Sequence, residues 1–514
     1  MTNLADLFPA GAGKQVSFTA SGAISAAGKP VILNAEGTVT QVSETTRGNT
    51  IGSEQDLATF SPTGIANGQS WAYDETNDRY LWIYGNPDAY SRGYASVVTI
   101  STGTVSEGTR NVFYSGSLGR TSARCIGSNK FLIIYQTYSD FYTYAKVATV
   151  SGTNISYGSQ VTINGSSTTL NEMGLAYSAT TNASIVAYKL GQAGVVSEIK
   201  LRRLTVSGTT ITVGSTVNAS SLFGTTYEEQ HGSPQIINNA SSDEFFLFWT
   251  GPHTGSGFTV KPAWAGIVTM SSGGALAGSG AAKATDKIKA LGGLAYLGND
   301  TYVVNFEGEV ASYARYCVAT VSSGAVTWGT DTAYESSAQA GLSWTVPQMC
   351  VAYDSSVDKV VVTQRPTASP YNRTFSTGVL SGTTITFASL TALSPATGST
   401  SFPFLIYDPS LEKTLFIYED SGDDMVLRLW EVTGDITNLT ATNFIGISDA
   451  AISDTSSGNI TIKGGIAATG LTSLTSGSDY YVQGDGTIST VTTSPAVKIG
   501  KAMSATSINL EYQS

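Results

Sequence analysis

The chain has 514 residues, enough for roughly two to four domains, and a formal net charge of −11. The acidic balance argues against a protein that binds nucleic acid or anionic membrane surfaces. The sequence has no apolar run of about 18 residues, so it predicts no membrane-spanning helix. With 55 glycines, many Ser and Thr residues and only 13% charged residues, the composition instead predicts an all-β protein.

Three cysteines, Cys125, Cys317 and Cys350, lie far apart in strand-like runs. Because their number is odd and their spacing wide, we expect buried free thiols rather than a disulfide framework. The first residues lack the basic and apolar regions of a secretory signal. Both observations predict synthesis in a reducing cytoplasm.

The first expected element is a hairpin, and the chain carries it twice. Residues 28–42 and 477–491 align without a gap. Gly28 matches Gly477, and an acidic residue followed by Gly-Thr stands at the same place in both copies. An acidic-Gly pair between alternating apolar runs predicts a hairpin turn. Both terminal segments therefore carry a copy of one small β motif.

Between these copies, residues 46–66 are interpreted as a linker or a closing strand, and residues 67–442 contain seven repeats. Each repeat has an apolar strand, a short polar turn, a second strand, a longer loop, a third strand, a Ser-Gly-type turn and a fourth strand. The glycines of these turns are Gly103, Gly152, Gly208, Gly273, Gly324, Gly382 and Gly434. Four antiparallel strands per unit at a fixed period predict a seven-bladed β-propeller. The alternative is a string of separate sandwich domains, for which the repeat is short.

The duplicated motif continues differently at the two ends. The strand that follows the second hairpin, residues 497–504, comes after a short link. Its counterpart for the first hairpin, residues 443–448, lies beyond the whole repeat region. Because one domain usually enters another at a loop between paired strands, we expect an inserted propeller. The small discontinuous β domain around it comprises residues 1–45 plus 443–514 and is interpreted as an anchor.

The terminal segments also carry a set of short phrases. They read Gly-x-x-Val-x-Leu-Asn-x-Glu-Gly-Thr-Val at residues 28–39, Phe-Ile-Gly-Ile-Ser at 444–448, Gly-x-x-Tyr-Tyr-Val-x-x-Asp-Gly-Thr-Ile-Ser at 477–489, and Ile-Gly-x-Ala-x-Ser-Ala-Thr at 499–506. With these phrases the segments resemble virion structural proteins of tailed bacteriophages. The layout of the first half is similar to the small β domain of head-decoration proteins in lambda-like phages.

This resemblance implies a protein that is made in the bacterial host cytoplasm and is located in the virion. It further implies contacts with other virion proteins and a homo-oligomer, with a trimer as the first expectation. It does not cover the propeller, which is predicted from the repeats.

The candidate binding segments are the loops between the second and third strands of several repeats. They are rich in Tyr, Ser, Gly and Asn, a composition typical of recognition surfaces. The candidate ligand-binding residues are Tyr90, Arg92, Tyr138, Phe141, Tyr142, His253, Phe258, Arg365, Tyr371 and Arg373. The alternative is that these tyrosines only pack between blades. Unless an N-terminal strand closes the ring, we expect these loops to share the propeller face at which the chain enters and leaves.

The sequence predicts no catalytic residue, no cofactor and no metal site. The two histidines, His231 and His253, lack a nearby carboxylate–nucleophile arrangement, and no Cys, His or carboxylate spacing fits a metal. An acidic stretch, residues 419–424, is interpreted as a solvated turn, with a Ca²⁺ loop as the alternative, although it lacks the spacing of a dedicated calcium loop. Five arginines from different repeats could serve an acidic sugar if the fold brought them together: Arg92, Arg124, Arg315, Arg365 and Arg373.

Three functional hypotheses follow. The first is a tail-fibre or similar appendage protein whose propeller binds a host-surface ligand such as a glycan. The second is a capsid head-decoration protein. The third, from a different class, is a carbohydrate-active propeller enzyme, which the missing carboxylate motifs disfavour.

Overall fold

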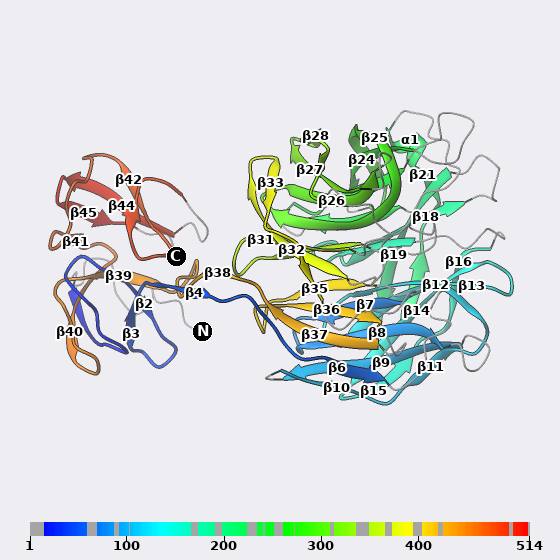
Figure 1. The fold of residues 1–514 in the computed structure, drawn as a ribbon, viewed down its shortest axis with the longest axis horizontal. Coiled ribbons are helices and arrows are strands. Elements are labelled where there is room, and N and C mark those ends of the chain that lie inside the picture. The colour runs from blue at the N-terminus through cyan, green and yellow to red at the C-terminus, as the bar shows by residue number, and fades with distance from the viewer. Residues whose placement is uncertain are drawn as a thin grey trace. The chain divides into compact units, whose positions relative to one another are not determined.

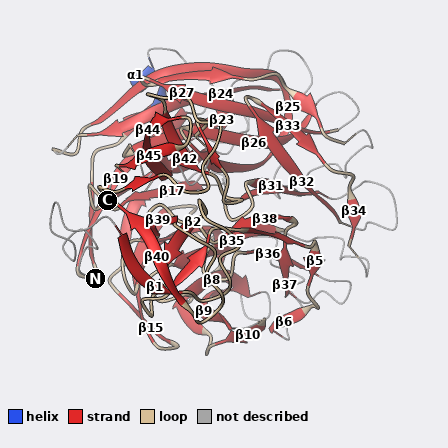
Figure 2. Ribbon diagram, turned by 90° about the vertical axis from the view of Figure 1, so that its left-hand side faces the viewer, coloured by secondary structure: helices blue, strands red, loops and turns tan. Residues whose placement is uncertain are grey.

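The computed structural model describes residues 15–58, 69–86, 92–101, 103–165, 173–190, 198–223, 234–239, 242–250, 261–271, 273–308, 313–335, 349–364, 373–393, 403–419, 425–492 and 497–511. Its contacts divide the chain into two compact units, Met1–Gly48 with Thr433–Ser514 and Asn49–Val432. Strands dominate both units, and the one helix in the described ranges is α1 (Ala219–Phe223) (Figure 2). No helix among these residues is long and apolar enough to cross a membrane.

The unit Asn49–Val432 consists of antiparallel blades whose strands follow one another in chain order (Figure 1). Blade one comprises β7 (Ser70–Asp74), β8 (Arg79–Asn86), β9 (Arg92–Ser101), β10 (Thr104–Glu107) and β11 (Asn111–Tyr114). Blade two comprises β12 (Leu118–Cys125), β13 (Lys130–Thr137), β14 (Thr143–Ser151), β15 (Asn154–Tyr157) and β16 (Val161–Asn164). Blade three comprises β17 (Met173–Ser178), β18 (Ala183–Leu190), β19 (Glu198–Ser207), β20 (Thr210–Val213) and β21 (Val217–Asn218).

The next two blades share one long strand, β25 (Leu276–Gly298), which pairs with β24 through its first half and with β26 through its second. Blade four comprises β22 (Gln235–Asn239), β23 (Glu244–Thr250), β24 (Lys261–Met270) and the start of β25. Blade five adds β26 (Thr301–Gly308), β27 (Ala314–Ser322), β28 (Ala325–Trp328) and β29 (Thr332–Ala333). Blade six comprises β30 (Cys350–Asp354), β31 (Lys359–Gln364), β32 (Thr374–Ser381), β33 (Thr384–Phe387) and β34 (Thr391–Ala392).

Blade seven combines both ends of the propeller unit. Its first three strands are β35 (Phe404–Asp408), β36 (Lys413–Glu419) and β37 (Met425–Glu431). Its outer strand is supplied by β5 (Thr50–Ile51) and β6 (Gln55–Ala58), which both pair with β37 (Figure 2). The described sheets therefore confirm the seven-bladed propeller and the all-β fold class.

One turn recurs in every blade and marks the repeat. The residue before each second strand has a left-handed backbone, with φ between 46° and 66°. These residues are Asp78, Asn129, Asn182, Asp243, Asp300, Asp358 and Glu412. Asp and Asn tolerate this conformation better than most side chains do, so the polar turns predicted between strands one and two are explained by backbone geometry.

The side chains that hold blade seven shut come from both chain segments. Tyr418 Oη and Arg428 Nη2 donate to Glu54 Oε1 at 2.5 Å and 2.7 Å. Trp430 Nε1 donates to Asn49 Oδ1 at 2.6 Å. Hydrogen bonds to a charged group contribute about 1.5–3 kcal/mol each, so this cluster stabilises the closed ring.

The predicted seventh Ser-Gly-type turn, at Gly434, is wrong. Residues Gly434–Thr437 form β38, which pairs with β4 (Glu44–Arg47) in the small unit. Gly434 is consequently not needed as a turn, because the N-terminal strands already occupy the position of a fourth strand. In blade four the left-handed turn glycine is Gly274 rather than Gly273.

The pairing of blade seven fixes where the chain enters and leaves the propeller. Glu431 at the end of β37 pairs with Thr50, and its neighbour Trp430 pairs with Thr414 near the start of β36. Entry and exit therefore lie at the end that carries the short turns between first and second strands. In an antiparallel meander, the loops between second and third strands lie at the opposite end. An N-terminal strand closes the ring, which is the case that the sequence expectation excepted, so these loops do not share the entry face.

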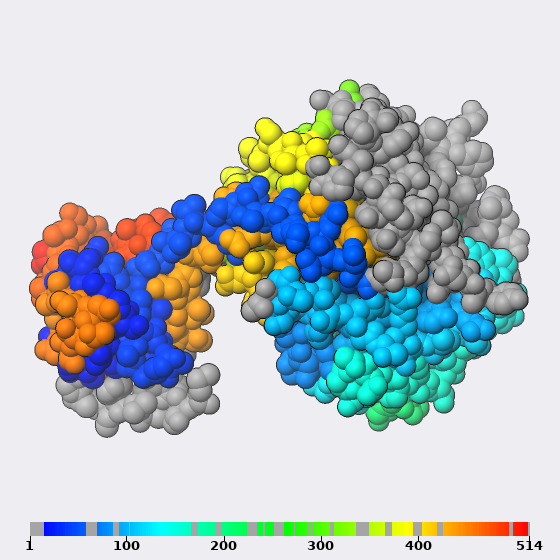
Figure 3. Space-filling model, turned by 60° about the horizontal axis from the view of Figure 1, so that its bottom comes forward, coloured from blue at the N-terminus to red at the C-terminus, as the bar shows by residue number. Residues whose placement is uncertain are grey.

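The small unit contains two five-stranded sheets with the same strand order. The first sheet has the order β3 (Val39–Gln41), β2 (Pro30–Leu33), β39 (Phe444–Ser448), β40 (Ser457–Ile462) and β1 (Gln15–Thr19). The second has the order β43 (Ile488–Ser489), β42 (Asp479–Val482), β44 (Val497–Ser504), β45 (Ser507–Leu510) and β41 (Ile466–Ala467). Figure 3 shows the N-terminal (blue) and C-terminal (orange) segments intermixed in this unit.

The hydrogen bonds of the two sheets correspond residue by residue. Gly28 and Gly477 both have φ near 80°, at 78° and 84°. Their amides donate to the carbonyl oxygens of Ser448 and Ala502, each at 2.8 Å. The duplicated phrase therefore specifies the same turn and the same partner strand twice, once across the propeller insertion and once across a short link.

A shared β-bulge extends the correspondence to residues outside the repeated phrase. The pairing of β2 with β39 and that of β42 with β44 shift register at Gly446 and at Gly500. A Cβ at these glycines would lie 2.2 Å from Thr461 O and 1.9 Å from Asn509 O. Only glycine allows the neighbouring strand to approach so closely.

The two sheets share a hydrophobic core because the first sheet is apolar on both faces. Val31 and Ile445 point into a core that belongs to the first sheet alone. Ile32, Phe444 and Ile447 point the other way and pack with the interior side chains of the second sheet. Full burial of one such aliphatic side chain contributes about 1.5–3 kcal/mol.

The face of the second sheet that points away from the shared core carries polar residues. The positions equivalent to Ile32, Phe444 and Ile447 are taken by Tyr481, Lys498 and Lys501. Asp479 forms ion pairs with Lys498 at 3.2 Å and with Lys501 at 3.6 Å. A charged outer face prevents a further copy from adding to the stack.

We predict that replacing either bulge glycine by alanine destabilises the small unit similarly. Gly446→Ala and Gly500→Ala should each lower the free energy of unfolding by about 1–3 kcal/mol, because the new methyl group meets a backbone carbonyl. Gly48→Ala is the control, since nothing lies within 4 Å of its Cβ position. Urea denaturation followed by circular dichroism measures the effect; unchanged stability in both variants would contradict the shared bulge.

We also predict that the propeller needs its N-terminal strands. A fragment of residues 49–432 should fold cooperatively, whereas a fragment of residues 59–432 lacks β5 and β6 and should melt at a lower temperature. The shorter fragment lacks Glu54 and therefore loses the hydrogen bonds that Tyr418 and Arg428 donate to its carboxylate. Differential scanning calorimetry compares the two fragments, and equal melting temperatures would rule out strand closure.

Candidate ligand-binding site

A cavity of about 340 Å³ lies in the centre of the propeller. Its walls come from the first strand of every blade, that is from β7, β12, β17, β22, the second half of β25, β30 and β35. Convergence of seven inner strands follows from the closed ring, and it brings together residues that are remote in sequence. Cavities of this size are typical of small-molecule sites.

The cavity lies toward one end of the central channel. Four of its lining residues are the first residues of their strands: Ser70 of β7, Met173 of β17, Cys350 of β30 and Phe404 of β35. First strands begin at the end opposite to their short turns. The cavity is therefore at the end of the propeller away from the points of chain entry and exit.

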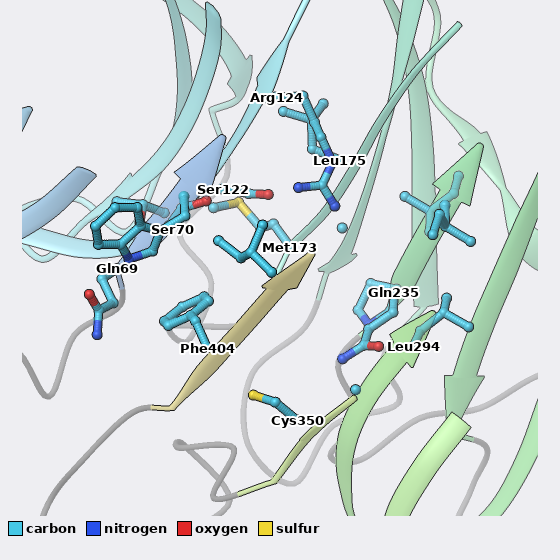
Figure 4. Close-up of a pocket in the computed structure, with 18 of the residues that line it drawn as sticks. Gln69, Ser70, Ser122, Arg124, Met173, Leu175, Gln235, Leu294, Cys350 and Phe404 are labelled. Atoms are coloured by element: carbon cyan, nitrogen blue, oxygen red, sulfur yellow. The ribbon is translucent and has the colours of Figure 1, made fainter. Parts of the chain in front are cut away.

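Two arginines supply the charge of the cavity, and both come from β12. Arg124 directs its guanidinium into the cavity (Figure 4), and its Nη1 donates to Ala123 O at 3.2 Å. Arg120 is 7% exposed, and its Nε has no hydrogen-bond partner among the described residues. A guanidinium has five N–H donors, so both groups retain unused hydrogen-bonding capacity.

The surroundings of Arg124 are unfavourable for its charge. The Arg124 side chain is exposed to solvent, and its partial burial by the neighbouring strands lowers its pKa from the ordinary arginine value. The lining residues that the structure describes include no Asp and no Glu. The cavity is thus positive inside a chain whose net charge is −11.

Neutral polar and apolar groups complete the wall. Gln235 donates weakly to Gly292 O at 3.5 Å, and Ser70 Oγ accepts the Ala123 amide at 2.9 Å. Met173 and Phe404 present apolar surface beside them (Figure 4). A few polar groups on a mainly apolar wall are the usual composition of a ligand site.

The structure brings together three of the predicted loop residues. Tyr138, Phe141 and Tyr142 lie between β13 and β14, and the rings of Tyr138 and Phe141 meet edge to face at 6.4 Å. Phe141 has a left-handed backbone with φ of 59°, which costs about 1–3 kcal/mol and needs support from its surroundings. This support comes from Asp140, which accepts the Tyr142 amide at 2.9 Å and the Tyr144 hydroxyl at 2.6 Å.

This loop is linked electrostatically to the cavity. Burial raises the pKa of Tyr138, and the positive charge of Arg120 opposes that rise. Burial would also raise the pKa of Asp140, but hydrogen bonds from Thr137, Tyr144 and the Tyr142 amide outweigh it and lower this pKa. Asp140 therefore holds the loop as a carboxylate, and Arg120 lies between the loop and the channel.

The other predicted site residues do not join this group. Arg92 is half-buried on β9, and Arg373 is fully buried beside β32; neither lines the cavity. The predicted residues outside the described ranges are Tyr90, His253, Phe258, Arg365 and Tyr371. Most of the acidic stretch 419–424 also lies outside the described ranges. The described residues contain no Cys, His or carboxylate cluster suited to a metal.

The five arginines considered for acidic sugars do not converge as a set. Arg124 lines the cavity, whereas Arg315 forms an ion pair with Asp331 within blade five. Sequence reasoning missed Arg120, together with the polar residues Gln69 and Gln235. The signal was available in principle, because the first residues of each inner strand converge in any propeller.

Comparisons with known proteins add little. No protein-family description and no curated protein matches the chain. A solved structure from Lactobacillus plantarum is 12% identical with a TM-score of 0.40, covering 74% of this chain and 97% of that chain. Sqt1 from Chaetomium thermophilum is 9% identical with a TM-score of 0.42, covering 75% and 100%. The Hadza microbial sialidase is 9% identical with a TM-score of 0.38, covering 80% and 94%. Such values carry no argument about what this chain does.

We predict that the thiol at the cavity wall is unreactive in the folded protein. Burial raises the pKa of Cys350 to about 12, although the nearby Arg373 opposes the shift. Its S–H donates to Pro403 O at 2.7 Å. Iodoacetamide at pH 8 should therefore modify Cys350 in urea but not in the native protein, as mass spectrometry can show. Rapid native modification would contradict this environment.

The same thiol predicts a pH dependence of stability. Its folded pKa lies above the unfolded value of about 8.5, so the folded state binds more protons between the two values. The stabilisation is complete below about pH 8.5 and is lost as the pH rises toward 12. In Cys350→Ala, the free energy of unfolding should fall less steeply over this window. An unchanged slope would contradict the raised pKa.

Proposed function

We propose that this protein is a structural component of a bacteriophage virion, most simply a tail-fibre or similar appendage. In this proposal the small unit anchors the chain to other virion proteins and the propeller binds a host-surface ligand. The virion assignment rests on the resemblance carried by residues 28–39, 444–448, 477–489 and 499–506. The comparisons with known proteins neither add to it nor replace it.

One observation supports assigning attachment to the small unit and ligand binding to the propeller. The chain enters and leaves the propeller at the end with the short turns, whereas the cavity lies toward the other end. A binding site at that end does not compete with the covalent attachment of the module. The ordered aromatic loop around Phe141 belongs to the same end, because it joins the second and third strands of blade two.

The small unit is suited to serve as an anchor. Its two sheets share a core that does not involve any residue of Asn49–Val432. The insertion occupies the link between β3 and β39, which corresponds to the short link between β43 and β44. The anchor can therefore fold around a module of any size, provided that the module returns the chain close to its starting point.

The alternative of a head-decoration protein uses the same anchor and differs in location and copy number. The alternative of a glycan-cleaving enzyme requires positioned carboxylates. Among the described residues that line the cavity there are none, so such a pair would have to come from elsewhere in the chain.

The proposal is tested on particles that carry an internal deletion. Joining Gly48 to Thr433 removes the propeller unit and should leave particles that assemble, contain the shortened protein and no longer adsorb to host cells. Gold-labelled antibodies against the small unit should mark the tail region of both particles. Label over the whole head would favour decoration, and the absence of the protein from purified particles would overturn the proposal.

A further inference from the structure

The strongest unexplained feature of the propeller is a pair of cations for which the described residues provide no counter-ion. Arg120 and Arg124 project from one strand toward the same cavity. The described residues form no ion pair with either, and among them the only acceptor for Arg124 is the carbonyl oxygen of Ala123, at 3.2 Å. By contrast, Arg79 and Arg315 in the surrounding blades each have an Asp partner.

We propose that the central cavity is a binding site for an anionic sugar derivative, whose acidic group pairs with Arg124 and Arg120. This inference rests on the proposed function and narrows its ligand from a host-surface glycan to an acidic one. The acidic group is a carboxylate or a phosphate, because both accept hydrogen bonds from guanidinium groups in a planar, two-pronged geometry.

An anion in the cavity compensates the positive charge of the two arginines. Arg120 is buried, and its Nε has no hydrogen-bond partner among the described residues, so an anion that enters the cavity supplies the missing partner. Walls of low dielectric constant strengthen the attraction, because few water molecules screen it. The remainder of the chain is acidic, so the cavity is a local reversal of charge rather than part of a basic surface.

The size and the wall of the cavity limit the rest of the ligand. A volume of about 340 Å³ holds roughly ten water molecules, which is enough for one sugar ring with its substituents. Ser122 and Gln235 offer neutral hydrogen-bonding groups for hydroxyls. Phe404 and Met173 offer apolar surface for the less polar face of a ring (Figure 4).

The test uses the full chain and isothermal titration calorimetry. The probes are D-glucuronate, N-acetylneuraminate and D-glucose 6-phosphate, with D-glucose as the neutral control. At least one anionic sugar should bind with a dissociation constant of about 1 mM or tighter, and D-glucose should not bind. Binding of the carboxylates alone or of the phosphate alone identifies the acidic group, and either result supports the proposal.

A matched pair of variants locates the site. Arg124→Gln should weaken binding by at least about thirtyfold, because it removes one partner of an enclosed charge pair. Arg110→Gln changes the net charge equally but alters a side chain outside the cavity that pairs with Glu107 at 3.6 Å, and it should leave binding unchanged. Without ligand, the melting temperature of Arg124→Gln should equal or exceed that of the parent chain, because an uncompensated charge has been removed.

Three results would overturn the proposal: no binding of any anionic sugar, equal binding of D-glucose, or unchanged binding by Arg124→Gln. Adsorption of the chain to host cells separates this failure from that of the proposed function. If cells bind the chain but Arg124→Gln has no effect on sugar binding or adsorption, the cavity assignment fails alone. If an acidic sugar binds through Arg124 but cells do not bind the chain, host attachment fails and the anion site stands.

Discussion

The pairing of β5 and β6 with β37 is the interaction on which the architecture depends. Without it, blade seven would expose the unpaired edge of its third strand, and the ring would remain open. Glu54 joins the two segments because it accepts hydrogen bonds from Tyr418 and Arg428. The same pairing brings Thr50 beside Glu431, so the chain enters and leaves at one place. The inner strands can then converge on a cavity at the other end.

The small unit accommodates the insertion of a whole domain. Its two sheets have equivalent strand orders, bulges and hydrogen bonds, and they differ in the outward side chains. Ile32 and Phe444 make the first sheet a partner for the second, whereas Lys498 and Asp479 close the second sheet toward solvent. Duplication thus supplied the fold, and a change of polarity at a few positions limited the stack to two sheets.

Local patterns predicted much of the fold. The repeated phrase specified a hairpin whose glycines must be left-handed, and the Ser-Gly turns located six of the described third-to-fourth strand connections to within one residue. Gly434 failed, because a strand from the other end of the chain had taken the fourth position, and no local pattern records such an exchange. The pairing of the two arginines was missed for a related reason. Arg120 and Arg124 become a pair of uncompensated cations only when seven remote strands converge.

The closed ring places Arg124 in a cavity without a carboxylate among its described lining residues. The most direct test is a crystal structure of the full chain grown with the tightest-binding acidic sugar. We expect the sugar in the central cavity, with its acidic oxygens roughly 3 Å from the Arg124 guanidinium. A sugar bound on the outer surface, or a guanidinium already paired with a carboxylate of the protein, would contradict the account.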